Sequence, residues 1–596
     1  MVDVRDAASA GETAGGAPAR WWDSAAIRVA AHATWVVLLC VAVVARIGRF
    51  GFNPSDQGFM LSLSWRLING EIPHVDVISA RPLGSAVLHV LDFAVPAPLF
   101  VSSAFVAALE ITVATIALAV LITGESPLRW GPLRTGLVAA AALVNMHTFP
   151  LMAWHTVDGI FLAAVGWWLL DSGLRGDSAW RRRLGLFLVG FAVMCKQSFA
   201  FAAPVALAML LWHPAVRRRP RRWGATVVDV VALGAFPLVY FAVVTVAGGL
   251  GESISQLTGG AQAWGERLWQ VWSTDFTAPG FDPRPVALLF ACCAIGAALA
   301  RGPRWTVAVR VAGAVAATVL VVYVIADGAL VRAGDWAIAL FWMLLAAAAV
   351  DGVIRRAVPW RGLMVALLGW MCSLSWGYSS PTLLGGSLAF GAMWLVWRSV
   401  PVPVLAAPVR LGTATALGLA GTVLAGLLVA AEHDRAPYFD QPQGMLTRDL
   451  GDVLPSMRGI RTSENTHRYV AQMSDCISRH PAGGIAVFPD NPFVYPATRH
   501  QNPFPIDWPL PMELVGDARE RMLNTVKELN ARGDYLVLFQ TVSFPALGSG
   551  ATVPASVPVD APIAGYGDLE ETIRSGLTDQ RISCGSFVGV WSPPSR

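Results

Sequence analysis

Residues 53–82 read NPSDQGFMLSLSWRLINGEIPHVDVISARP and directly follow the first long apolar run of the chain. The stretch is too polar to cross a membrane and too long for a simple turn between two spans. Phe59, Leu63 and Leu67 recur at every fourth position, which predicts one apolar stripe on a helix lying in the membrane interface. Asp56 precedes this stripe and stands at the predicted N-cap of the helix. The stretch therefore predicts a structured loop on one membrane face.

The composition around this stretch is that of a membrane protein. The 596 residues are 55% hydrophobic and only 14% charged, with a mean hydropathy of +0.53, whereas soluble domains carry about 25% charged residues. The net charge of +4 is spread along the chain and accompanies no nucleic-acid-binding motif, so a nucleic-acid partner is not expected. The first nineteen residues are polar, with no apolar core and no cleavage site, and residues 1–28 are predicted to be a disordered cytoplasmic tail. Arginine greatly outnumbers lysine, which favours a bacterial source with a GC-rich genome.

Apolar runs recur between residues 29 and 431 and predict a polytopic α-helical protein with about thirteen transmembrane helices. The connecting loops alternate between arginine-rich segments and segments that carry acids, glycine and aromatic residues. The positive-inside rule then places the N-terminus in the cytoplasm, and loop 49–97 and the tail from 432 outside a bacterial plasma membrane. The predicted spans are 29–48, 98–122, 134–148, 157–171, 184–195, 199–213, 224–248, 285–300, 305–326, 336–354, 362–378, 380–397 and 409–431.

Residues 432–596 have a different pattern. GIAVFP, DYLVLFQ and SFVGVW read as buried strands, and helical segments such as ENTHRYVAQMSDCISRH lie between them. This alternation predicts a small C-terminal extracytoplasmic α/β domain docked on the outer face. Cys476 and Cys584 share an oxidising compartment there, so they are either a disulfide or two free thiols. The loop PDNPFVYPATRHQNPFPIDWP either covers a cleft or only packs.

Several motifs together resemble a known family. An acid early in the first outer loop, then interfacial helices, then a basic-Pro step at Arg81-Pro82 resembles the GT-C superfamily of integral-membrane glycosyltransferases. The nearest similarity is to the branch of bacterial protein mannosyltransferases and the lipid A aminoarabinose transferase. FPLMAWHTVDGIFLAAVGWWLL, with Asp158, is similar to the second outer loop of that family. GFAVMCKQSFAFAAPVALAML, with Lys196-Gln197, is similar to its basic segment at an outer helix end. IAVFPDNPFVYPATRHQNPFPIDWP is similar to the outer-domain segment of uncharacterised relatives.

The resemblance implies inverting transfer from a polyprenyl-phosphate-linked sugar to an envelope glycan, lipid or protein. In that reaction Asp56 is the expected catalytic base, since a carboxylate can accept the proton of the acceptor hydroxyl. Arg81, Lys196 and Gln197 are the expected ligands of the donor phosphate. Lys196 has separate support, because it is one of two lysines in the chain and lies in an apolar stretch.

A second group of residues is expected to bind substrate or to support the base. A divalent cation, Mg²⁺ or Mn²⁺, shared by Asp56 and Asp158 is optional, because a phosphate leaving group is already ionised. Ala80 stands where some relatives carry an acid that binds metal, so the metal site stays open. The secondary site residues are Asp158, His155, Arg66 and Asp76.

Each site residue also has a purely structural interpretation. Asp56 and Asp158 can be helix caps, and Arg81 and Lys196 can extend their charges to lipid headgroups. Gln57 stands where many relatives carry a second acid. Two further functions therefore stay open: a lipid-linked glycan flippase or transporter, and a non-catalytic relative that acts as a binding or scaffold protein.

Overall fold

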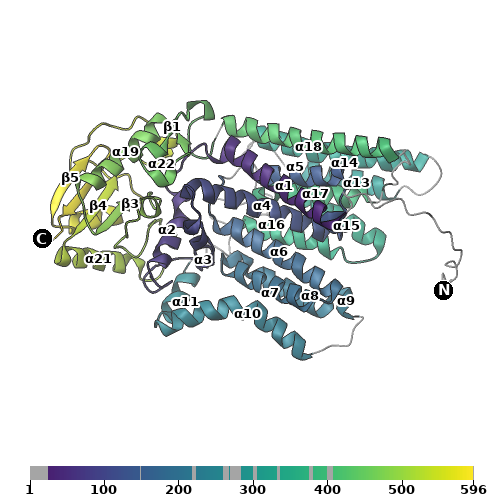
Figure 1. Cartoon of the computed structure of the whole chain (residues 1–596), viewed down its shortest axis with the longest axis horizontal. Helices are drawn as coiled ribbons and strands as arrows, with labels where there is room; N and C mark the ends of the chain where they lie inside the picture. The colour runs from purple at the N-terminus through teal and green to yellow at the C-terminus, as the bar shows by residue number, and fades with distance from the viewer. Residues whose placement is uncertain are drawn as a thin grey trace.

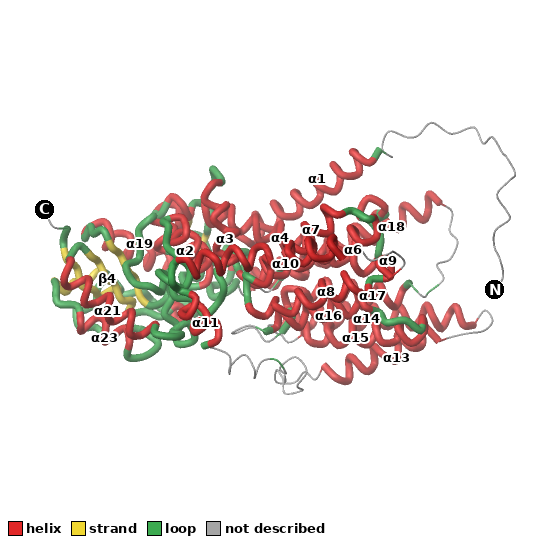
Figure 2. The backbone as a smooth tube through the Cα atoms, turned by 90° about the horizontal axis from the view of Figure 1, so that it is seen from below, coloured by secondary structure: helices red, strands yellow, loops and turns green. Residues whose placement is uncertain are grey.

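The computed structural model combines a long helical bundle with a smaller α/β region at one end (Figure 1). Strands lie only at that end of the described chain (Figure 2). The expected tail 1–28 lies outside the described residues as far as residue 23, and residues 25–28 already belong to α1. The structure describes residues 24–147, 150–217, 223–259, 268, 283–299, 305–331, 336–374, 380–398, 400, 407–435 and 437–594.

Each of the thirteen predicted spans overlaps a helix. The apolar helices are α1 (Ala25–Val43), α4 (Leu99–Thr123), α5 (Pro132–Asn145), α6 (His155–Gly176), α7 (Ala179–Val193), α8 (Ala202–Trp212), α10 (Trp223–Val246), α13 (Pro283–Leu299), α14 (Trp305–Val331), α15 (Trp336–Arg355), α16 (Trp360–Ser373), α17 (Gly385–Trp397) and α18 (Ala407–Arg435). Short helices α9 (Pro214–Arg217) and α11 (Leu250–Thr258) flank α10.

Eight stretches of helix in the described chain are long and apolar enough to cross a membrane, so the protein is a multi-pass membrane protein. Helices of 13 to 17 residues, such as α5, α13 and α17, rise only about 20–25 Å at 1.5 Å per residue, less than the ~30 Å hydrocarbon core. The expected count of thirteen is therefore confirmed as helices but not as spans. The eight are Ala25–Gly48, Leu99–Thr123, His155–Gly176, Gln197–Arg217, Trp223–Val246, Thr306–Gly328, Trp336–Arg355 and Leu411–Arg435.

The two kinds of loop lie at opposite ends of the bundle. Arg175 donates to the carbonyl oxygen of Gly124 over 3.0 Å, and Arg361 lies 3.5 Å from Asp171, so arginine-rich loops meet at one end. At the other end, loop 49–97 lies beside the C-terminal domain. Of the loops expected outside, residues 148–149, 260–282 apart from 268, and 332–335 are outside the described part.

The C-terminal domain is built on a four-stranded mixed sheet in the order β3-β4-β6-β5. Strand β3 is parallel to β4, and the other neighbours are antiparallel. Alternate residues of the two central strands enter two separate cores, one beside α19 and one beside α21 and α23. This burial on both faces explains their continuous apolar sequence. The elements are β3 (Gly484–Phe488), β4 (Tyr535–Gln540), β5 (Gln580–Cys584), β6 (Phe587–Ser592), α19 (Glu464–Arg479), α21 (Ala518–Arg532) and α23 (Leu569–Gly576), with the small pair β1 (Arg448–Asp449) and β2 (Arg461–Thr462) and short helices α20 (Val494–Thr498) and α22 (Phe544–Gly548).

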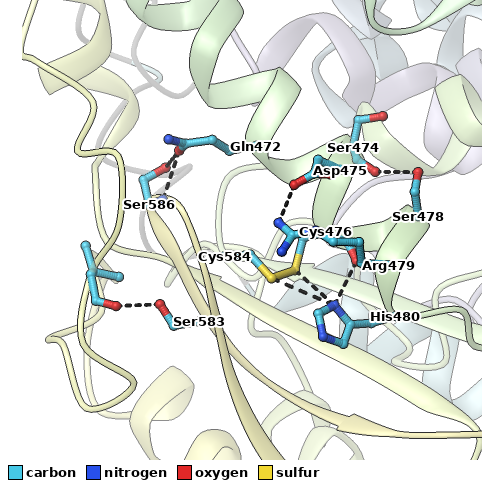
Figure 3. The surroundings of a disulfide bond; sticks show 11 residues. Gln472, Ser474, Asp475, Cys476, Ser478, Arg479, His480, Ser583, Cys584 and Ser586 are labelled. Carbon is cyan, nitrogen blue, oxygen red and sulfur yellow. Dashed lines mark hydrogen bonds and ion pairs between the residues drawn. A yellow bond between two sulfur atoms is a disulfide. The ribbon is translucent and has the colours of Figure 1, made fainter.

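Cys476 and Cys584 form a disulfide that joins α19 to the end of β5 (Figure 3). Of the two alternatives that the sequence left open, the disulfide is the one observed. The bond closes a loop of 108 residues, which holds together the two ends of the domain. A disulfide persists in oxidising compartments, and its presence here agrees with an extracytoplasmic location.

Helices α2 (Asp56–Ile68) and α3 (Gly84–His89) lie where the bundle meets the C-terminal domain. The sequence predicted an interfacial α2 with one apolar face. Instead, ten of its residues are buried, from Asp56 through Ser64 together with Arg66. The physical reason is that the C-terminal domain covers the polar face, which sequence periodicity assigned to water.

Candidate active site

One polar face of α2 contacts the C-terminal domain. The side chains three or four positions apart on this helix share a face. Phe59 packs edge-on against Trp508, with ring centroids 5.2 Å apart. Ser62 donates to Asp507 over 2.8 Å, and Arg66 Nη2 lies 2.7 Å from Asp507 Oδ1. The Pro-rich loop predicted after β3 therefore packs against α2.

Close approach of backbones fixes this contact. A Cβ on Gly58 would lie 2.1 Å from the Cα of Phe493, a distance that no side chain tolerates. Glycine at position 58 thus lets α2 lie directly on the segment after β3. This contact region between α2 and the segment after β3, the junction, brings side chains from distant parts of the sequence into one buried space.

Asp56 begins α2 at this junction and is 8% exposed. Its Oδ2 accepts hydrogen bonds from Tyr438 over 2.8 Å and from Asn53 over 3.2 Å. Among the described residues, no hydrogen bond reaches Oδ1, and no backbone N–H donates to this carboxylate. Asp56 is therefore the first residue of the helix and does not cap it. Its Oδ1 can accept a further hydrogen bond.

The surroundings of Asp56 raise its pKa to about 6. Burial is the largest cause, because it penalises the ionised form. The hydrogen bond from Tyr438 and the charge of Arg81 lower the pKa, while the charge of Asp490 raises it. Asp56 thus has the pKa of a base that is ionised at neutral pH and still holds a proton well.

Asp490, which follows β3, is a second buried acid of the junction. Its carboxylate accepts from Trp508 Nε1 and Gln540 Nε2, each over 2.9 Å, and from the hydroxyl of Tyr566. Burial raises its pKa, and these hydrogen bonds oppose the rise. The C-terminal domain therefore contributes a carboxylate that sequence reasoning missed.

Arg81 lies beside the same junction. Its Nη1 is 2.5 Å from Glu513 Oε1 in an ion pair that lacks hydrogen-bond geometry, and its guanidinium carbon lies 5.9 Å from the ring centre of Phe59. Nε and Nη1 are buried and have no hydrogen-bond acceptor in the described structure. Arg81 also lines a cavity of about 10 Å³ together with Ser79 and His155, about the space that one water molecule needs. Nε has neither a hydrogen bond nor an ion pair among the described residues, so it can still donate to an anionic ligand.

Lys196 and Gln197 are close to Arg81. Lys196 is fully buried, and its Nζ donates to Thr156 over 3.2 Å. Gln197 donates to the carbonyl oxygen of Ala80, the residue before Arg81. The structure therefore brings the two predicted phosphate-binding segments together.

The backbone of Gly84 holds these segments in contact. Its N–H donates to the carbonyl oxygen of Met194 over 2.7 Å. A Cβ at this position would lie 2.4 Å from that same oxygen. Gly84 is therefore required for the approach of the basic-Pro step to the lysine segment.

The secondary candidates lie in several environments. His155 lines the same small cavity as Arg81 and Cys195, and its Nδ1 is buried without a hydrogen-bond partner in the described part. Arg66 is held by Asp507 and Glu71 at the domain contact. Asp76 is exposed and accepts from the N–H of Ile72 over 2.7 Å in its own turn.

Asp158 faces a different group of side chains. Its carboxylate accepts from Ser85 and lies 3.1 Å from His89 Nε2, and Glu110 lies in the same cluster. The clusters of possible metal ligands in the described chain include Asp158 but not Asp56. A cation shared by Asp56 and Asp158 thus has no support in this geometry.

Sequence reasoning missed most partners of these residues. Only Glu110 carried a signal, as an isolated acid within an apolar run. The others are ordinary polar residues that meet through the fold. They are Tyr438, Asp490, Glu513, Tyr566, His89 and Asp92.

The protein is thus a polytopic helical membrane protein with a small, disulfide-bonded C-terminal α/β domain. No protein-family model and no curated protein sequence matches the chain. The resemblance to GT-C enzymes therefore rests on the short motifs that contain Asp56, Arg81, Asp158 and Lys196.

Proposed function

We propose that the chain is a glycosyltransferase that uses a polyprenyl-phosphate-linked sugar at the outer face of the plasma membrane. The observation that carries the proposal is the carboxylate of Asp56. It is buried, its pKa is raised to about 6, and its Oδ1 accepts no hydrogen bond among the described residues. Arg81, whose Nε has no hydrogen-bond acceptor among the described residues, lies near enough to lower that pKa.

The chemistry needs a base and a site for the departing phosphate. Asp56 accepts the proton of the acceptor hydroxyl as its oxygen bonds to the anomeric carbon. The bond from that carbon to the phosphate oxygen breaks, and its electron pair leaves with the lipid phosphate. Inversion follows because the acceptor attacks from the opposite side. Raising the pKa of the base makes proton transfer more favourable while leaving Asp56 ionised above about pH 6.

Arg81 and Lys196 stabilise the phosphate in this proposal. A guanidinium can bind two phosphate oxygens, and an ammonium adds a point charge. Burial strengthens both interactions, because little water screens them. Glu513 now pairs with Arg81, so donor binding exchanges one anion for another without leaving the guanidinium uncompensated.

The test is transfer of radiolabelled sugar in proteoliposomes from a panel of polyprenyl-phosphate sugars to an envelope extract. Asp56→Asn should lower turnover by about 10²–10⁴-fold. Asp475→Asn, a matched change on the exposed surface of α19, should keep wild-type turnover. Wild-type turnover in a folded Asp56→Asn protein would refute the base assignment, and absence of product with every donor would refute the enzyme.

One observation favours a second candidate, a carrier of lipid-linked glycans. Glu110 lies in α4, a candidate span, where an ionisable side chain is costly and usually functional. A carrier moves its substrate without cleaving the sugar–phosphate bond. Appearance of intact lipid-linked glycan in the opposite leaflet of proteoliposomes, with no sugar transfer, would select this function.

A further inference from the structure

A second buried polar cluster lies apart from Asp56, among helices α3, α4 and α6. It consists of His89, Glu110 and Asp158, one from each helix. One nitrogen or carboxylate oxygen from each residue lies within 4.8 Å of the others, and all three side chains are buried. This spacing is that of groups that can reach a common ion.

Neighbouring side chains fix the orientation of two members. His89 Nε2 lies 3.1 Å from Asp158 Oδ1, while His89 Nδ1 lies 2.9 Å from Asp92 Oδ2. Ser85 donates to the other oxygen of Asp158. Metal-binding histidines usually donate their second ring N–H to a carboxylate, and metal-binding carboxylates are likewise held from behind. Asp92 and Ser85 occupy these supporting positions.

The third member has no such partner. Glu110 is 5% exposed, and its Oε2 is buried without a hydrogen bond among the described residues. It faces a second carboxylate, Asp158, inside a span. Two carboxylates so close in an apolar environment repel each other unless a cation or a shared proton lies between them.

We propose that this cluster binds one divalent transition-metal ion, Zn²⁺ or Mn²⁺, through His89 Nε2, Asp158 Oδ1 and Glu110 Oε2. An imidazole with two carboxylates suits these ions better than Mg²⁺ or Ca²⁺, which prefer oxygen ligands alone. Three protein ligands leave a coordination position for water. The ion would neutralise the facing carboxylates and tie α3 to α4 and α6.

The site goes beyond the proposed transfer reaction and does not depend on it. A bound ion would fix the position of the loop that carries Arg81. Helix α3 begins at Gly84, three residues after Arg81. An ion that anchors α3 therefore also holds the loop that carries Arg81, whichever substrate that arginine meets.

The test measures the metal itself. The full chain, purified through a tag without histidine and stripped with chelator, is loaded with Zn²⁺ or Mn²⁺. Metal content is then counted by mass spectrometry, and bound Mn²⁺ is observed by electron paramagnetic resonance. We expect about one ion per chain, with binding of Mg²⁺ or Ca²⁺ at least about tenfold weaker. Less than a tenth of an equivalent in the wild-type protein overturns the proposal.

Two variants locate the ion. Glu110→Gln keeps the shape of the side chain and removes a ligand, so it should lower affinity by at least about tenfold. Asp92→Asn leaves all three ligands in place and should still lower affinity by about 10–100-fold, because His89 loses its support. His480→Ala, beside the disulfide, is the control that should keep wild-type affinity. Unchanged affinity in the two site variants, or loss of the ion in the control, overturns the proposal.

Discussion

Replacing Asp56 by asparagine should stabilise the protein, and by an amount that depends on pH. Burial and Asp490 raise the pKa of Asp56 from 3.8 to about 6 in the folded chain. This difference of roughly two units, at 1.36 kcal/mol each, means that the ionised carboxylate costs about 3 kcal/mol of folding free energy. Asparagine carries no charge, and its carbonyl oxygen can replace Oδ2, which accepts both hydrogen bonds.

The sign follows from the proton balance. Between about pH 4 and pH 6 the folded state holds the proton of Asp56 more tightly than the unfolded state. The contribution of Asp56 to the wild-type free energy of unfolding therefore falls as pH rises through that window, and the fall is complete above it. The gain from Asp56→Asn should be about 3 kcal/mol near pH 8 and about half that near pH 5.

The assay is thermal unfolding of the purified proteins in detergent near pH 5 and pH 8. The midpoint of Asp56→Asn should exceed that of wild type by more at the higher pH. Two further variants sharpen the test. Tyr438→Phe removes a hydrogen bond to Asp56 and should raise its pKa, and Asp490→Asn removes a neighbouring negative charge and should lower it. An equal shift at both pH values, or a lower midpoint near pH 8, would refute a buried carboxylate with a raised pKa.

Three other predictions follow from the same junction. Wild-type kcat/KM should rise with pH through about 6 as Asp56 ionises, and a flat profile would contradict its role as base. Arg66→Met should lower the free energy of unfolding by about 3–5 kcal/mol in chemical denaturation, because Asp507 is left buried without its partner; a loss below about 1 kcal/mol would contradict the ion pair. Gly84→Ala should lower the free energy of unfolding by about 1–3 kcal/mol and so lower the thermal midpoint, since its Cβ meets the carbonyl of Met194; an unchanged midpoint would show that the two segments separate easily.

Local patterns predicted the elements, because each depends on residues near in sequence. The spans follow from runs of apolar residues, and β3, β4 and β6 from apolar segments buried on both faces. Strand β5 was missed, since QRISC lacks such a run and its first two residues are exposed. Asp56, Arg81 and Lys196 were found because a charge in or beside apolar sequence is conspicuous.

The partners of these charges were not predictable in the same way. Asp490 is 434 positions from Asp56 in the sequence. Tyr438, which donates a hydrogen bond to Asp56, is 382 positions from it. Nothing local marks a tyrosine or an aspartate in a polar domain as part of the candidate site. Asp490 influences Asp56 only because α2 packs against the segment after β3, which Gly58 permits. Long-range packing thus determined the electrostatics of the site.

These contacts imply that the bundle alone is an incomplete site. Asp56 and Arg81 belong to loop 49–97, but Asp490 raises the pKa of the first and Glu513 pairs with the second. Without the C-terminal domain, Asp56 would lose both its burial and its acidic neighbour, so its pKa would move back towards that of an ordinary aspartate. Arg81 would at the same time face water instead of a single carboxylate. Each of the two residues thus has an acid of the C-terminal domain as a neighbour, so we infer that this domain sets the protonation of Asp56 and the anion affinity of Arg81.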